Sequence, residues 1–135
     1  MSLTMSLIKY KMNDNGKYFE ENMNVIQRSF LSEPLNEKIV EKIKYAELTL
    51  FENEDSQETS VLDCIENTRI DEVIEIIKEE FIKLMSRTDK LKSNQKRTNI
   101  HEIILEYKEI SNIYDLLFKK QSTYIDDNSV IVKIG

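Results

Sequence analysis

Few residues of this 135-residue chain are of the types that carry out catalysis. It has one His, His101, and one Cys, Cys64, so it lacks the several Cys and His ligands of a zinc site. A Cys–His nucleophile would need these two residues to meet. Cys64 lies beside Ile65 in a short amphipathic segment, which favours a small buried side chain. We expect His101 to be a partly exposed residue in the first turn of a helix.

Two glutamate pairs have a spacing that puts both carboxylates on one side of a helix: Glu72 with Glu75, and Glu106 with Glu109. Together they resemble the magnesium-binding set of all-helical nucleotide pyrophosphohydrolases, which implies a carboxylate-dependent Mg hydrolase as one alternative. Glu72 and Glu75 fall mainly off the apolar stripe of their segment, so we expect them to face solvent. The chain also has no Gly-rich phosphate loop and no Gly-x-Ser-x-Gly motif. We therefore predict a protein that is not an enzyme, with no catalytic residue, metal or cofactor.

Basic residues are concentrated in one segment of an acidic chain. The formal net charge is −6 and the isoelectric point about 4.9, yet residues 83–97 hold six basic side chains and one acidic one. Cations at the end of a helix interact favourably with its dipole, which explains the cluster without a ligand. The alternative is contact with a phosphate, an acidic partner or nucleic acid, although nucleic-acid-binding domains are usually basic overall. The six residues of this basic cluster are Lys83, Arg87, Lys90, Lys92, Lys96 and Arg97.

Composition limits the class of protein. With 2 Gly and 1 Pro, the chain has few residues suited to the many tight turns of a sandwich or barrel, so helix is the expected structure. A single Cys fits a reducing compartment, so we expect a cytoplasmic or otherwise intracellular protein. No apolar run approaches the roughly twenty residues that span a bilayer, and the first residues lack the basic and apolar regions of a signal peptide, so we expect a soluble protein that does not bind membranes.

The first half of the chain predicts one strand and several helices. Residues 7–12 alternate between apolar and polar, as in a half-buried strand, and Asn13 to Gly16 form a turn. Apolar residues from 17 to 31 recur three or four apart, which predicts a helix that ends before Pro34. Asn36 is expected to cap a second helix to about residue 51, and Ser60 a short helix through residue 65. The acidic stretch 52–58 is expected to be a solvated loop.

Two long amphipathic segments give the strongest signals. Thr68 and Asp71 form a capping pair before an apolar stripe that predicts a helix over about 69–91. Asn99 and Glu102 form a similar start for a helix over about 100–120. A connection of residues 92–98 has a length usual between bundle helices, so we expect the two helices to pack antiparallel through their stripes.

The C-terminal residues predict a strand, because 130–134 are rich in β-branched side chains. Its partner is expected to be the N-terminal strand or, alternatively, a second molecule. The second case makes Val130, Ile131, Val132 and Ile134 a candidate strand-pairing interface.

Together these elements predict a mainly α fold, at the margin of α+β, with a four-helix bundle-like core and short terminal strands. Residues 5–135 are expected to form one domain. We interpret residues 1–4 as a leader, because Met5 repeats the start of the chain.

The composition is similar to that of small acidic helical host-modulating proteins of viruses, including Bcl-2-like ones, but no residue matches a signature motif. We predict a protein–protein interaction module, such as an adaptor, inhibitor or assembly subunit, with a protein partner or a homodimer. A subunit that binds nucleic acid through the basic cluster is the alternative.

Overall fold

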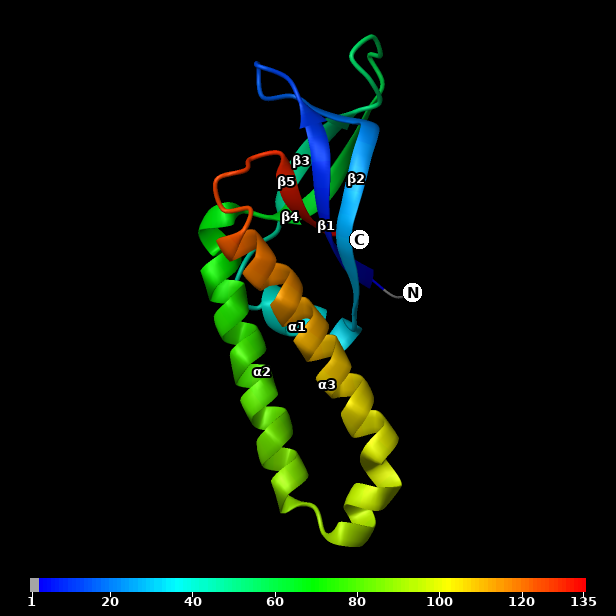
Figure 1. Ribbon diagram of the computed structural model, residues 1–135, viewed down its shortest axis with the longest axis vertical. Coiled ribbons are helices and arrows are strands. Elements are labelled where there is room, and N and C mark those ends of the chain that lie inside the picture. The colour runs from blue at the N-terminus through cyan, green and yellow to red at the C-terminus, as the bar shows by residue number, and fades with distance from the viewer. Residues whose placement is uncertain (1–2) are drawn as a thin grey trace.

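The computed structural model describes residues 3–135, except for the side chain of Lys96. It combines a small barrel with a long helical hairpin that extends away from it (Figure 1). Met1 and Ser2, part of the segment that we interpreted as a leader, lie outside the described residues, whereas Leu3 and Thr4 belong to the first strand. The strands are β1 (Leu3–Met12), β2 (Tyr18–Leu31), β3 (Ala46–Phe51), β4 (Thr59–Ile65) and β5 (Val130–Ile134), and the α-helices are α1 (Glu33–Val40), α2 (Ile70–Lys90) and α3 (Ser93–Ser122), with a 3-10 turn at Asn67–Arg69.

The five strands close into a ring in the order β1-β2-β3-β4-β5. A ring with an odd number of strands cannot be antiparallel throughout, because each antiparallel step reverses the chain direction. The exception here is the β2–β3 pair, which is parallel and joins Tyr18 with Leu50 and Phe19 with Phe51. Every other neighbouring pair is antiparallel. The β1–β2 pair has irregular register near Leu7 and again after Lys9, which bends the long β2 strand.

Successive side chains of a strand point to opposite faces, so the strands contribute to two separate apolar cores. One lies among the strands and contains Ile8, Tyr10, Leu50, Leu62 and Cys64. The other lies between the strands and the helices, where Met5 and Leu7 of β1 and Val130 and Val132 of β5 meet the inner faces of α2 and α3. The barrel therefore packs against the hairpin through the face of β1 and β5 that does not contribute to the core among the strands.

The predicted mainly α, four-helix bundle-like fold is wrong, because the chain is 46% helical and 32% strand and its strands form a barrel. Residues 18–31 of the predicted 17–31 helix form strand β2, and Phe30, one of the apolar residues at helical spacing, is 53% exposed. Residues 60–65 are strand β4, in which Leu62 and Cys64 alternate inward. In both segments the backbone N–H and C=O groups form hydrogen bonds with other strands of the barrel. This pairing outweighs the local spacing of apolar residues, which also fits a helix.

The predicted helix over 36–51 is also wrong in its bounds. Helix α1 begins at Glu33, with Ser32 as its N-cap and Pro34 in its first turn, where a missing amide proton is harmless. Proline therefore starts a helix here instead of ending one. Asn36, the predicted cap, accepts a hydrogen bond from the Tyr45 hydroxyl at 2.7 Å. The second part of the segment, 46–51, is strand β3.

The strands at both ends and the helical hairpin are confirmed. β5 pairs with β1, as predicted, and also with β4. Helix α2 matches the prediction closely, whereas α3 starts at Ser93, seven residues before the predicted start at residue 100, where the Lys92 amide donates to Gln95 Oε1 at 2.9 Å. The two helices are joined by only Leu91 and Lys92. Among the described residues, no helix is long and apolar enough to cross a membrane.

Candidate functional site

The four glutamates of the magnesium hypothesis do not converge. Glu72 pairs with Arg69 at 2.7 Å, and Glu75 pairs with Lys78 at 3.3 Å. Glu106 pairs with Arg87 across the hairpin at 2.6 Å. Glu109 accepts a hydrogen bond from the Ser32 amide at 2.8 Å and so ties α3 to the end of β2. The part of the chain that the structure describes contains no group of three His, Cys, Asp or Glu side chains placed to hold a metal ion.

Cys64 and His101 lie in different parts of the molecule. Cys64 is buried among the strands, and burial raises the pKa of its thiol to about 11, with smaller contributions from Glu66 and Asp63. A thiol with this pKa stays protonated at neutral pH and is a poor nucleophile. His101 is exposed on α3, near the tip of the hairpin. The prediction of a buried Cys64 is confirmed. His101 is exposed, but the prediction that it lies in the first turn of its helix is wrong, because α3 begins eight residues earlier, at Ser93.

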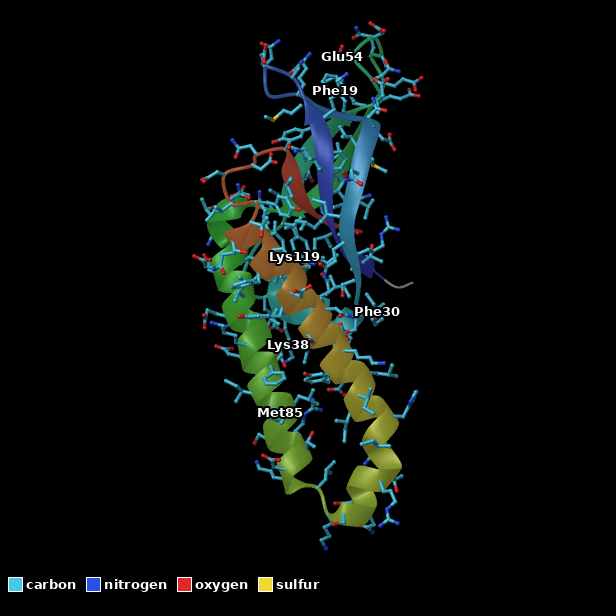
Figure 2. The ribbon with its side chains drawn as sticks, viewed as in Figure 1. Phe19, Phe30, Lys38, Glu54, Met85 and Lys119 are labelled. Carbon is cyan, nitrogen blue, oxygen red and sulfur yellow. The ribbon has the colours of Figure 1, made fainter. Side chains whose placement is uncertain are left out.

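The basic cluster is divided between two places. Lys83, Arg87 and Lys90 line a cleft of about 670 Å³ between α1, α2 and α3, and Lys38 joins them from α1. Three carboxylates line the same cleft: Glu80, which pairs with Lys38 at 3.1 Å and Lys83 at 3.7 Å, Glu106 and Glu109. Figure 2 shows Lys38 at this level of the hairpin. The positive charge of this part of the cluster is therefore largely balanced by acidic neighbours.

The rest of the basic cluster lies at the tip of the hairpin. Lys92 connects the two helices, and Lys96 and Arg97 belong to the first turns of α3. Lys92 and Arg97 are exposed, and the side chain of Lys96 lies outside what the structure describes. The cleft and the tip are thus two sites, and the sequence did not distinguish them.

The candidate strand-pairing interface, β5, is one of the five strands of the barrel wall. β5 runs between β1 and β4, with Val132 opposite Leu7 on one side and Ile65 on the other. Val130, Val132 and Ile134 are buried, and Ile131 packs against the core among the strands. Both edges of β5 are therefore occupied within the chain.

The hairpin has two unlike faces. On one face the barrel and α1 cover it: Gln27 of β2 donates to the Asn112 carbonyl at 3.3 Å, and Ser32 donates to Glu109. The opposite face, which we call the outer face, is exposed and apolar. Ile82 and Glu80 illustrate the separation, because residues two apart on a helix lie about 160° apart around its axis. The outer face consists of Phe81, Ile82 and Met85 of α2 and Ile100, Ile104, Tyr107 and Phe118 of α3, all between 36% and 65% exposed.

Two aromatic contacts lie on the outer face, one between α2 and α3 and one within α3. The rings of Phe81 and Tyr107 lie 5.9 Å apart, and those of Tyr114 and Phe118 are stacked at 6.1 Å. Between the helices lies a shallow groove of about 420 Å³, lined mainly by apolar side chains that include Ile77, Phe81, Ile82, Tyr107, Ile110 and Tyr114. Figure 2 shows Met85 in the half of α2 that lies farther from the barrel.

Sequence reasoning missed the outer face because it assigned residues of this face, such as Phe81 and Tyr107, to the same stripes as the buried residues that join the two helices. On α3 the buried stripe contains Ile110, Ile113, Leu116 and Leu117, whereas Ile104, Tyr107 and Phe118 lie on another side of the helix. The sequence did contain a signal of the outer face, because the apolar residues of α3 cover an arc of the helix that is too wide for one contact surface and so indicates two contact surfaces. Comparison with protein-family models, curated proteins and solved structures gave no match for this chain.

Proposed function

We propose that this chain is a non-enzymatic protein–protein interaction module, an adaptor, inhibitor or assembly subunit, that binds its partner through the outer face of the hairpin. The observation that carries the proposal is the apolar character of this face, which seven exposed large side chains form on two adjacent helices. Exposed apolar patches of this kind mark interaction sites on soluble proteins. We further propose that the protein works in a reducing, intracellular compartment, because its one Cys is a buried free thiol.

The chemistry of the remaining residues supports a binding function over a catalytic one. In the cleft, Lys38 and Lys83 pair with Glu80, and Arg87 pairs with Glu106. The Cys64 thiol lies in an apolar core, and burial raises its pKa. We do not extend the nucleic-acid alternative, because Lys83 and Arg87 already face Glu80 and Glu106. The strand-pairing route would need an open edge on β5, and both edges are paired.

A photo-crosslinking experiment tests the proposal. A photoreactive phenylalanine derivative replaces Tyr107 on the outer face in one variant and Phe30 of β2 in the control, both aromatic and exposed by 47% and 53%. In an extract of the native source, the Tyr107 position is expected to form a discrete protein adduct that the Phe30 position does not form. Adducts of equal yield at both positions, or none at Tyr107, would contradict a role for the outer face. Adding Ile82→Glu to the Tyr107 variant should reduce the adduct, because it places a carboxylate in the apolar contact.

A further inference from the structure

Helix α3 is packed over only part of its length. Its C-terminal half contains the fully buried side chains of Ile113, Leu116 and Leu117. In contrast, none of the described side chains from Ser93 to Leu105, which we call the distal segment, is buried. Figure 1 shows the distal segment at the end of the molecule farthest from the barrel. The burial of side chains therefore does not hold this segment in a helix.

Polar contacts do not hold the distal segment either. In the part of the chain that the structure describes, none of its side chains forms a hydrogen bond or ion pair with another helix or strand. Its side-chain hydrogen bonds stay within residues 92–98. The Lys92 amide donates to Gln95 Oε1, and the Thr98 hydroxyl donates to the Asn94 carbonyl, both at 2.9 Å. A hydroxyl bonded to the carbonyl four residues earlier slightly destabilises a helix.

Most residues of the distal segment have weak helix propensity. Ser, Asn, Thr, His and Ile occupy eight of the twelve positions from 93 to 104. Ser, Asn and Thr side chains compete for backbone groups, and β-branched side chains lose rotamer freedom in a helix. The packed turns that follow remove the cost of nucleation, but each further turn toward the N-terminus must still be stable in water. Intrinsic propensity thus favours fraying of α3 from its N-terminus.

The charges at the start of α3 also disfavour a helix there. The first turns of α1 and α2 carry acidic residues, Glu33, Asp71 and Glu72, which interact favourably with the helix dipole. The first turn of α3 has no acidic residue, and Lys92 and Arg97 lie near its positive end. Cations at this end of a helix interact unfavourably with the dipole. Burial, polar contacts, propensity and charge therefore all leave the distal segment weakly stabilised.

We infer that the distal segment is an order–disorder element that regulates the outer face; this inference rests on the proposed function. In the free chain the segment exchanges between a helix and an uncoiled form, and the uncoiled form is the larger population. Ile100 and Ile104 belong both to the segment and to the outer face, and they are 52% and 43% exposed. A protein partner on the outer face buries them and so stabilises the helical form. Helix formation and binding are coupled, and the uncoiled population lowers the apparent affinity.

Hydrogen exchange of the full chain without a partner tests the equilibrium. The first four amides of any helix lack an intrahelical acceptor, so the amides of residues 98–105 are the informative ones. We expect them to be protected less than about 3-fold, because little free energy opposes their opening. Amides of residues 113–117 should be protected about 1000-fold or more, because they exchange only when the packed core opens. Equal protection in the two halves of α3 would overturn the inference.

A pair of substitutions at Thr98 tests the coupling to binding. Thr98 is exposed and lies about 160° around the helix from Ile100, so it changes helix stability without changing the outer face. The photoreactive residue at position 107 reports binding in the same extract. Thr98→Ala should give about 2- to 5-fold more adduct than Thr98→Gly, because Ala favours the helical, binding-competent form. The matched control is the same pair at Asn112, exposed in the packed half of α3, where the two yields should be equal.

The outcomes separate this inference from the proposed function. Equal adduct yields from the two Thr98 variants would overturn the coupling and leave the binding role of the outer face in place. The same ratio at Thr98 and Asn112 would also overturn it, because the effect would then come from the overall stability of the chain. Absence of any adduct at position 107 would reject the proposed function and the coupling together.

Discussion

The rings of Phe81 and Tyr107 lie 5.9 Å apart at an interplanar angle of 50°, one on each helix of the hairpin. Neither ring is buried, since Phe81 is 36% and Tyr107 47% exposed. The two residues thus join α2 to α3 while presenting part of their apolar surface outward. Beneath them, on the inner side of α2, Leu84 is 2% exposed and forms the local core.

Truncation of Leu84 should loosen the hairpin. We expect Leu84→Ala to lower the free energy of unfolding by about 2–4 kcal/mol, because it leaves a cavity where the one buried side chain among those described in residues 81–109 was packed. Leu105→Ala, at a position 53% exposed on α3, is the control and should change it by less than about 0.5 kcal/mol. Urea unfolding measures both values, and hydrogen exchange should be faster around residues 81–109 in the Leu84 variant. Equal losses in the two variants would show that Leu84 is not the local core.

Lys120 is a buried lysine that holds the segment between α3 and β5. It is 2% exposed, and its Nζ donates to the carbonyl oxygens of Tyr124 and Asp127, each at 2.9 Å. Burial lowers its pKa, and Asp127 opposes this effect. We expect Lys120→Met to lower the free energy of unfolding by about 1–3 kcal/mol, because two carbonyl groups lose their donor.

The matched control for Lys120 is its neighbour. Lys119 is 44% exposed and donates to Gln27 Oε1 at 2.6 Å, so Lys119→Met should cost less than about 1 kcal/mol. Chemical denaturation at neutral pH compares the two variants. A larger loss for Lys119→Met than for Lys120→Met would contradict the anchoring role of Lys120.

The turn between β1 and β2 depends on Gly16. Its φ is +78°, and its amide donates to the Asn13 carbonyl at 3.0 Å. A Cβ at this position would meet no atom within 4 Å, so any cost of Gly16→Ala comes from backbone conformation alone. We expect a loss of about 1–2 kcal/mol in the free energy of unfolding, measured by thermal or urea denaturation. Asn15→Ala in the same turn is the control, and a neutral Gly16→Ala would refute the conformational argument.

Alkaline pH should destabilise the barrel through Cys64. The pKa of its thiol is raised from 9.0 to about 11 by burial, so above pH 9 the unfolded chain releases a proton that the folded chain retains. The associated stability is complete below pH 9 and is lost as the pH rises through about 11. Between pH 8 and 10, the free energy of unfolding should fall more steeply for the unmodified chain than for Cys64→Ala, by at most about 1.4 kcal/mol per pH unit.

Other groups also titrate in this pH range, so the contribution of the Cys64 thiol is taken from the difference between the unmodified chain and Cys64→Ala. Burial raises the pKa of Tyr10 and of Tyr45 to about 12, which adds to the loss, whereas the lowered pKa of Lys120 acts in the opposite direction. Apart from a minor contribution of Cys64 to the raised pKa of Tyr10, these effects are common to both chains. Parallel pH profiles of the two would show that Cys64 does not titrate as its burial requires.

The sequence alone determined the elements whose patterns are local. Residues 7–12 alternate as a strand, Val130–Ile134 is rich in β-branched residues, and the stripe beginning at Ile70 spans several helical turns. Each of these elements depends on a periodicity that can be seen within one segment. The burial of Cys64 and the exposure of His101 were also predicted, but Cys64 was placed in a short helix that is strand β4, and His101 in the first turn of a helix that begins eight residues earlier.

Tertiary structure decided the rest, because pairing between distant strands has no local signature. Residues 18–31 have apolar residues at helical spacing, yet they form β2, which pairs along its length with β1 and bends at two irregularities. The outer face likewise exists because the barrel and α1 cover one side of α2 and α3 and leave the other uncovered. Local spacing specifies which side chains share a face of a helix, but only the packed fold decides which face is buried.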